Sequence, residues 1–273
     1  MQVLILCSDA DEYLPLLREV DGFDWVLHTA ASAEEALDGE KNVEVILGQP
    51  DMVASVIDEF PALRWVQSSW AGVTPLLEHG RRNYLLTGVK DTFGPQMAEY
   101  VLTYLLAHEF RLLERLGRQA NRNWWPEPTG TLQGKTLGLM GTGSIACHIA
   151  RRLKPFGLKV TGLSRSGAAV EGFDRVFPAE NLLAFLSQPD YVVCVLPDTP
   201  ETRGLLDREA IASMHEGCYL VNVGRGSVLD ENALAAALNG GMLAGAALDV
   251  FQNEPLPESS PLWHARGALV TAH

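Results

Sequence analysis

A short glycine-rich segment carries the clearest chemical pattern in this sequence. It consists of Gly141, Thr142, Gly143, Ser144, Ile145 and Ala146. The segment follows the apolar run 137–140 and opens a stretch with helical periodicity. Gly141 permits a tight turn, Gly143 lets the backbone approach a pyrophosphate, and Ala146 takes the third small position, where the helix packs on the strand. Because a helix N-terminus favours anions, the pattern predicts a dinucleotide site rather than a merely structural turn.

The end of the next predicted strand indicates which dinucleotide is preferred. Residues 158–163 are followed by Ser164, Arg165 and Ser166, roughly 20 residues past Gly141, where NAD-preferring sites usually place Asp or Glu for the ribose 2′-hydroxyl. Two hydroxyls and a guanidinium stand there instead, and these groups suit a 2′-phosphate. The sequence therefore favours NADP; NAD stays open as a second cofactor if Arg165 only stacks on the adenine.

Three polar residues follow strand-like runs in the second half of the chain. Arg225, Glu254 and His273 each come shortly after such a run. Because ligands of open parallel sheets bind beyond the carboxyl ends of the strands, the three are expected to converge. Taken singly, such an Arg is more often an ion-pair partner, a Glu before proline a loop cap, and a lone His a structural residue. Their combination is what indicates a catalytic set.

The segments around these residues resemble the D-isomer-specific 2-hydroxyacid dehydrogenase family. The matching segments are 196–202, 222–226, 248–251, 254–257 and 270–273. The spacing of Arg225, Glu254 and His273 fits too, and the resemblance is strongest from about Gly134 onward. Within the family the chain is most similar to the glyoxylate/hydroxypyruvate reductase A branch. That similarity is carried by 164–166, 124–125 and 96–100.

The resemblance implies reduction of small 2-oxo acids, such as glyoxylate and hydroxypyruvate, by hydride transfer from NADPH. It implies that His273 protonates the forming alkoxide as a general acid. Glu254 would favour the imidazolium and hold its ring. Arg225 would bind the substrate carboxylate and ketone oxygen and stabilise developing negative charge.

Further contacts are implied by the same resemblance. Besides residues 141–145 and 164–166, the cofactor would contact Leu196, Pro197, Thr202, Val223, Gly224 and Asp249. Asp249 would face the nicotinamide amide, although a strand-end cap is its alternative role. The substrate would contact Trp70, Ala71, Gly72 and Val73, with backbone N–H groups holding its carboxylate.

Strands and helices alternate along the whole chain, which predicts an α/β protein with two Rossmann-like domains, parallel sheets and a cofactor cleft between them. We expect a flavodoxin-like substrate domain at 1–94 and a dinucleotide-binding Rossmann domain at 95–273. A single helix is expected from Pro95 to Asn121. Its first half is apolar all round, which favours burial on more than one side and a homodimer.

Composition narrows the functional class. The chain has 273 residues and a formal net charge of −13, which disfavours nucleic acid as a partner. No apolar run reaches the roughly 20 residues of a membrane-spanning helix, so no membrane association is expected. The 4 cysteines show no metal-binding spacing, which favours free thiols in a cytoplasmic protein and predicts no metal site.

Two departures from the family pattern affect the catalytic end. Ala272 stands where the family usually has Pro, and the sequence stops at His273, whereas relatives usually return to the substrate domain with further helices. That C-terminal return is therefore expected to be missing. The competing function is a dinucleotide-sensing, corepressor-like protein without turnover, which the intact Arg225, Glu254 and His273 disfavour.

Overall fold

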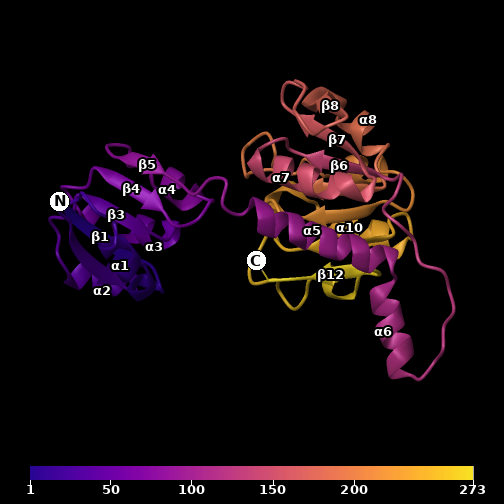
Figure 1. The fold of residues 1–273 in the computed structure, drawn as a ribbon, viewed down its shortest axis with the longest axis horizontal. Helices are drawn as coiled ribbons and strands as arrows, with labels where there is room; N and C mark the ends of the chain where they lie inside the picture. The colour runs from indigo at the N-terminus through magenta and orange to yellow at the C-terminus, as the bar shows by residue number, and fades with distance from the viewer. Residues whose placement is uncertain (273) are drawn as a thin grey trace. The chain divides into compact units, whose positions relative to one another are not determined.

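The computed structural model describes residues 1–272 and divides the chain into two compact units. The first unit is Met1–Lys90, and the second begins at Asp91 (Figure 1). Each unit contains one sheet in which every strand pair is parallel. The predicted α/β class is confirmed.

The first unit has a five-stranded sheet in the order β2-β1-β3-β4-β5. This is the flavodoxin-like order, in which the chain reverses direction between β1 and β3. Ile5 and Leu6 are fully buried and belong to separate clusters, because successive strand residues point to opposite faces. The elements are β1 (Gln2–Leu6), α1 (Ala10–Arg18), β2 (Val26–Ala30), α2 (Ala33–Asp38), β3 (Val45–Gly48), α3 (Pro50–Val56), β4 (Trp65–Ser68), α4 (Thr74–His79) and β5 (Leu85–Thr87).

The second unit has a seven-stranded sheet in the order β12-β11-β10-β9-β6-β7-β8. The chain starts at β6, moves outward to β8, and then returns to β9 on the other side of β6, so the switch point lies between β6 and β9. The strands are β6 (Thr136–Met140), β7 (Lys159–Ser164), β8 (Arg175–Pro178), β9 (Tyr191–Cys194), β10 (Tyr219–Asn222), β11 (Gly245–Leu248) and β12 (Ala268–Val270). The helices are α5 (Gly94–Glu109), α6 (Leu112–Ala120), α7 (Ser144–Leu153), α8 (Leu182–Leu186), α9 (Arg208–Ala212) and α10 (Glu231–Asn239).

Helices cover both faces of this second sheet. Val101 of α5 and Ile149 of α7 pack with Leu139 of β6 on one face. Leu234 of α10 packs with Leu220 of β10 on the other, together with residues of α8 and α9. Both layers are buried, which explains why the strands read as continuous apolar runs.

The prediction of one helix from Pro95 to Asn121 is wrong. Helix α5 ends at Glu109, and Arg111 adopts a left-handed conformation with φ of +51° before α6 begins. The carbonyl of Glu109 accepts a hydrogen bond from the distant N–H of Gly130 at 2.8 Å, so a remote partner satisfies it where the helix stops. Within residues 1–272 no helix is both long and apolar enough to span a membrane.

Candidate active site

The glycine-rich segment forms the turn between β6 and α7. Gly141 has φ of +107°, a conformation that side chains rarely adopt, and its N–H donates to the carbonyl of Leu163 at 2.9 Å. A Cβ on Gly143 would meet nothing within 4 Å, so the backbone there faces open space. Ala146 is fully buried against the sheet. The three small residues therefore have the environments that the motif requires.

The N-terminus of α7 fits a bound anion. Gly143 supplies no side-chain cap, and the first turn of the helix contains no acidic residue. The Ser144 hydroxyl donates to the carboxylate of Asp91, whereas the backbone N–H groups of the turn have no side-chain cap. The open space at Gly143 and the uncapped N–H groups are what a dinucleotide pyrophosphate needs.

The loop after β7 holds the predicted specificity residues. The Ser164 and Ser166 hydroxyls accept hydrogen bonds from the N–H groups of Gly167 at 3.1 Å and Ala168 at 3.3 Å. Arg165 has no hydrogen bond or ion pair with any residue of 1–272. Its charge contributes, after hydrogen bonds from the backbone and Thr199, to lowering the pKa of Glu201. The turn is therefore fixed, and the guanidinium remains available to a ligand.

A buried asparagine shapes the turn that carries Arg225. Asn222, at the end of β10, is fully buried; its Oδ1 accepts the N–H of Gly224 at 3.1 Å and its Nδ2 donates to the carbonyl of Arg225 at 3.2 Å. Among residues 1–272, the Arg225 guanidinium donates only to the carbonyl of Gly224, at 2.6 Å. Its other donors are free for a planar, bidentate anion.

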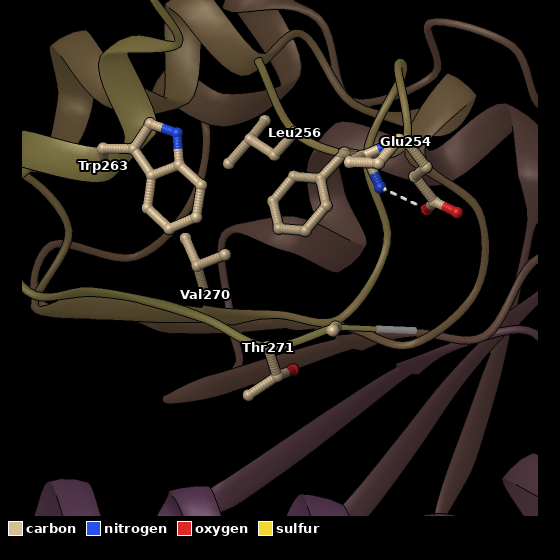
Figure 2. A pocket seen from close by; sticks show the side chains of 8 residues that line it. Glu254, Leu256, Trp263, Val270 and Thr271 are labelled. Carbon is tan, nitrogen blue, oxygen red and sulfur yellow. Dashed lines mark hydrogen bonds between the residues drawn. The ribbon is translucent and has the colours of Figure 1, made fainter. Parts of the chain in front are cut away.

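Glu254 lies on a neighbouring loop in direct contact with the Arg225 turn. A Cβ on Gly226 would stand 1.9 Å from the carbonyl carbon of Phe251, so the two backbones touch. The N–H of Phe251 in turn donates to Glu254 Oε1 at 2.9 Å, as Figure 2 shows. The structure thereby brings the loops of Arg225 and Glu254 together.

Glu254 also lines a pocket of about 610 Å³ next to the end of the described chain. Figure 2 shows Leu256, Trp263 and Val270 around its apolar part. Ala272 lines the same pocket, whereas the predicted acid, His273, lies outside the described residues. Its role stays a prediction.

The loop after β9 contains the other predicted cofactor contacts, and it is held by its own hydrogen bonds. Thr202 Oγ1 donates to the carbonyl of Pro197 at 2.6 Å. Asp198 binds Arg203 through two hydrogen bonds of 2.8 and 2.9 Å, which are the main cause of its lowered pKa. A Cβ on Gly224 would stand 2.7 Å from the carbonyl oxygen of Leu196, so this loop packs closely on the one after β10.

The predicted substrate loop belongs to the first unit. Residues 69–73 connect β4 to α4, and the buried Ser68 hydroxyl both accepts from the N–H of Trp70 at 3.0 Å and donates to its carbonyl at 2.7 Å. This fixes the backbone before Ala71, Gly72 and Val73, whose contact with a substrate stays a prediction. Trp70 is half exposed.

Comparison with known proteins identifies the family. Residues 102–273 match the model of the D-isomer specific 2-hydroxyacid dehydrogenase family, NAD binding domain. The chain belongs to the D-isomer specific 2-hydroxyacid dehydrogenase family. It is accordingly an NAD(P)-dependent 2-hydroxyacid dehydrogenase.

Individual relatives agree with this assignment. The chain is 36% identical to glyoxylate/hydroxypyruvate reductase A from Serratia proteamaculans, over 77% of this chain and 70% of that protein. A family member from Aeromonas salmonicida superposes with a TM-score of 0.94 at 38% identity, covering 100% of this chain and 88% of the other. The NADPH-dependent glyoxylate/hydroxypyruvate reductase from Sinorhizobium meliloti, in complex with NADP and sulfate, has a TM-score of 0.85 at 28% identity, covering 99% and 87%.

One polar network in this dehydrogenase was missed by sequence reasoning. Tyr100 of α5 shares a 2.7 Å hydrogen bond with the Thr271 hydroxyl, which donates to Asp249 Oδ1 at 2.5 Å. The network fixes Asp249, the predicted nicotinamide contact, through Thr271, which stands two residues before His273 in the sequence. Tyr100 lies within the segment 96–100 that carried the branch resemblance, but no local pattern connects it with Thr271.

Proposed function

We propose that this dehydrogenase reduces small 2-oxo acids, such as glyoxylate and hydroxypyruvate, and uses NADPH in preference to NADH. One observation carries the cofactor preference: Arg165 stands without a hydrogen bond or ion pair among residues 1–272, and residues 164–166 include no acid. The names of the Serratia and Sinorhizobium relatives support the substrates.

Each part of the dinucleotide has a proposed partner. The first turn of α7, from Gly143 to Ile145, would hold the pyrophosphate, and Arg165 with its flanking serines the 2′-phosphate. Asp249 would hold the nicotinamide amide. When bound, NADPH supplies a hydride for the ketone carbon of the substrate.

The remaining residues bind the 2-oxo acid and supply the proton for its reduction. Arg225 binds the substrate carboxylate and stabilises the negative charge that develops on the ketone oxygen. Backbone N–H groups of residues 70–73 donate further hydrogen bonds to the carboxylate. His273 gives a proton to that oxygen, and Glu254 keeps the imidazole protonated and oriented.

The test is the rate of NADPH and NADH oxidation with glyoxylate, hydroxypyruvate and pyruvate, for the wild type and His273→Ala. We expect turnover with the first two acids, a preference for NADPH, and loss of turnover in the variant with NADPH binding retained. Full activity of His273→Ala would remove the acid assignment. NADPH binding without turnover of any acid would favour the sensor function instead.

The proposed assembly is a homodimer formed through residues 110–130, called the arm below. Helix α6 buries none of its residues, and Leu112, Leu113 and Leu116 are 46–52% exposed. The arm carries four arginines against two glutamates in a chain of net charge −13. An apolar, basic arm is complementary to a second copy of this acidic chain.

A further inference from the structure

A buried carboxylate lies at the base of the arm. The side chain of Glu109, the last residue of α5, is only 3% exposed. Lys135 Nζ lies 2.6 Å from its Oε1, and the Tyr191 hydroxyl donates to the same oxygen at 2.5 Å. We call these three residues the Glu109 cluster. His108 Nε2 lies 4.0 Å from the same oxygen, and Asp190 and Cys218 are further titratable groups near Tyr191.

The cluster joins both ends of the arm. The arm leaves α5 directly after Glu109 and returns to Gly130, whose N–H donates to the Glu109 carbonyl at 2.8 Å. A Cβ on Gly130 would stand 1.9 Å from Glu109 Oε2, so any larger residue there would force the carboxylate to move. Lys135 follows shortly after, just before β6. The two ends of the arm therefore meet at one side chain.

Beyond these ends, the arm is tied together mainly by its own contacts. Arg115 donates to the carbonyl of Glu127 at 2.6 Å, and the guanidinium of Arg111 lies 4.2 Å from the centre of the Trp125 ring. Figure 1 shows α6 extending away from the rest of the second unit. Its direction is consequently set where the arm is attached, and not by burial of α6.

We propose that Glu109 is a positioning residue for self-association: its buried, paired carboxylate fixes the direction of the arm. This rests on the proposed homodimer. Tyr191 remains a hydroxyl donor because burial, followed by the neighbouring carboxylate, raises its pKa. A buried charge that loses either partner is costly, so Glu109 stays in place, and with it the carbonyl that accepts the N–H of Gly130 where the arm returns.

Two variants disturb the cluster in different ways, and a third is their control. Glu109→Gln removes the charge with little change of shape, whereas Gly130→Ala changes no charge but places a methyl group against the carboxylate. Gly39→Ala adds the same methyl group in the first unit, outside the arm, where a Cβ would meet only ordinary contacts at 3.7 Å. All three are compared with wild type in the full chain, with circular dichroism to check folding.

The readouts are the dimer dissociation constant from analytical ultracentrifugation and the rate of trypsin cleavage after Arg118 and Arg122. We expect Glu109→Gln and Gly130→Ala to weaken the dimer roughly tenfold or more and to speed cleavage of the arm, with Gly39→Ala like wild type. Wild-type dimerisation and cleavage rates in both cluster variants would overturn the proposal for Glu109 while leaving the homodimer intact. A monomeric wild type would overturn the homodimer and this inference together.

Discussion

The two ends of the seven-stranded sheet differ in whether their polar side chains are hydrogen-bonded within the protein. Beyond the carboxyl ends of β6, β7 and β10, the first turn of α7 has no side-chain cap. Among residues 1–272, Arg165 has no hydrogen bond or ion pair, and Arg225 donates only to Gly224. At the start of β9, by contrast, Tyr191 and Lys135 both bind the buried Glu109. At one end of the sheet, hydrogen-bond donors of the protein are therefore left open to a ligand. At the other end, the donors are used within the protein itself.

This difference separates two energetic roles. A satisfied buried group contributes to stability and geometry, because removing one partner leaves the other desolvated. A donor left open in the folded state contributes nothing until a ligand arrives, and its substitution should change binding rather than stability. The predictions below test that separation.

The largest effect is expected for Arg225→Lys. A lysine keeps the charge but lacks the planar fork, so kcat/KM for hydroxypyruvate should fall roughly 10²–10³-fold. The dissociation constant for NADPH, measured by fluorescence titration, should stay unchanged. An unchanged kcat/KM would show that Arg225 does not bind the substrate carboxylate as proposed.

Arg165→Gln should alter the choice of cofactor. The loss of a charged hydrogen-bond donor should lower the ratio of kcat/KM for NADPH over NADH roughly 10–100-fold. Activity with NADH serves as the internal control and should be preserved. An unchanged ratio would mean that Arg165 only stacks on the adenine and that both cofactors bind.

Gly143→Ala should weaken NADPH binding without affecting folding. Its φ of −77° suits alanine, and the added Cβ meets no protein atom, but it occupies the space proposed for the pyrophosphate. We expect roughly tenfold weaker binding, about 1.4 kcal/mol, at an unchanged melting temperature. Gly117→Ala is the matched control, and equal NADPH affinity in the two variants would contradict the anion site.

Tyr191→Phe probes the opposite end. The carboxylate of Glu109 would lose one of its buried donors, which should lower the free energy of unfolding by about 1–3 kcal/mol in urea titrations. NADPH affinity should not change. A variant of normal stability with impaired NADPH binding would reverse the proposed division between the two ends.

The smallest effect concerns Asp198, which shows that a loop at the open end is itself held by a satisfied pair. Its pKa is lowered below the ordinary 3.8, chiefly by Arg203, so the pair contributes stability above that pH and loses it as the carboxyl is protonated. Arg203→Gln should cost about 0.5–1 kcal/mol of unfolding free energy near neutral pH. The difference from wild type should shrink in urea titrations carried out at progressively lower pH, from about pH 6 to about pH 3. A constant difference would assign the stabilisation to packing.

Patterns within one segment were readable from the sequence, whereas contacts across the chain were not. The turn at Gly141 and the helix after it follow from local residue types, because φ and close packing restrict those positions. The end of α5 was missed because Glu109 is an ordinary helix residue whose carbonyl partner, Gly130, lies 21 positions later. Tyr100 was missed for the same reason, since its partner Thr271 is 171 residues away.

The contact between Gly226 and the Phe251 peptide has a consequence for adaptation of the enzyme. With main chain pressed on main chain, neither loop can shift without carrying the other along. The cavity beside Trp263 and Leu256 would accordingly change its shape through exchanges of side chains, while the framework bearing Arg225 and Glu254 stays as one rigid piece.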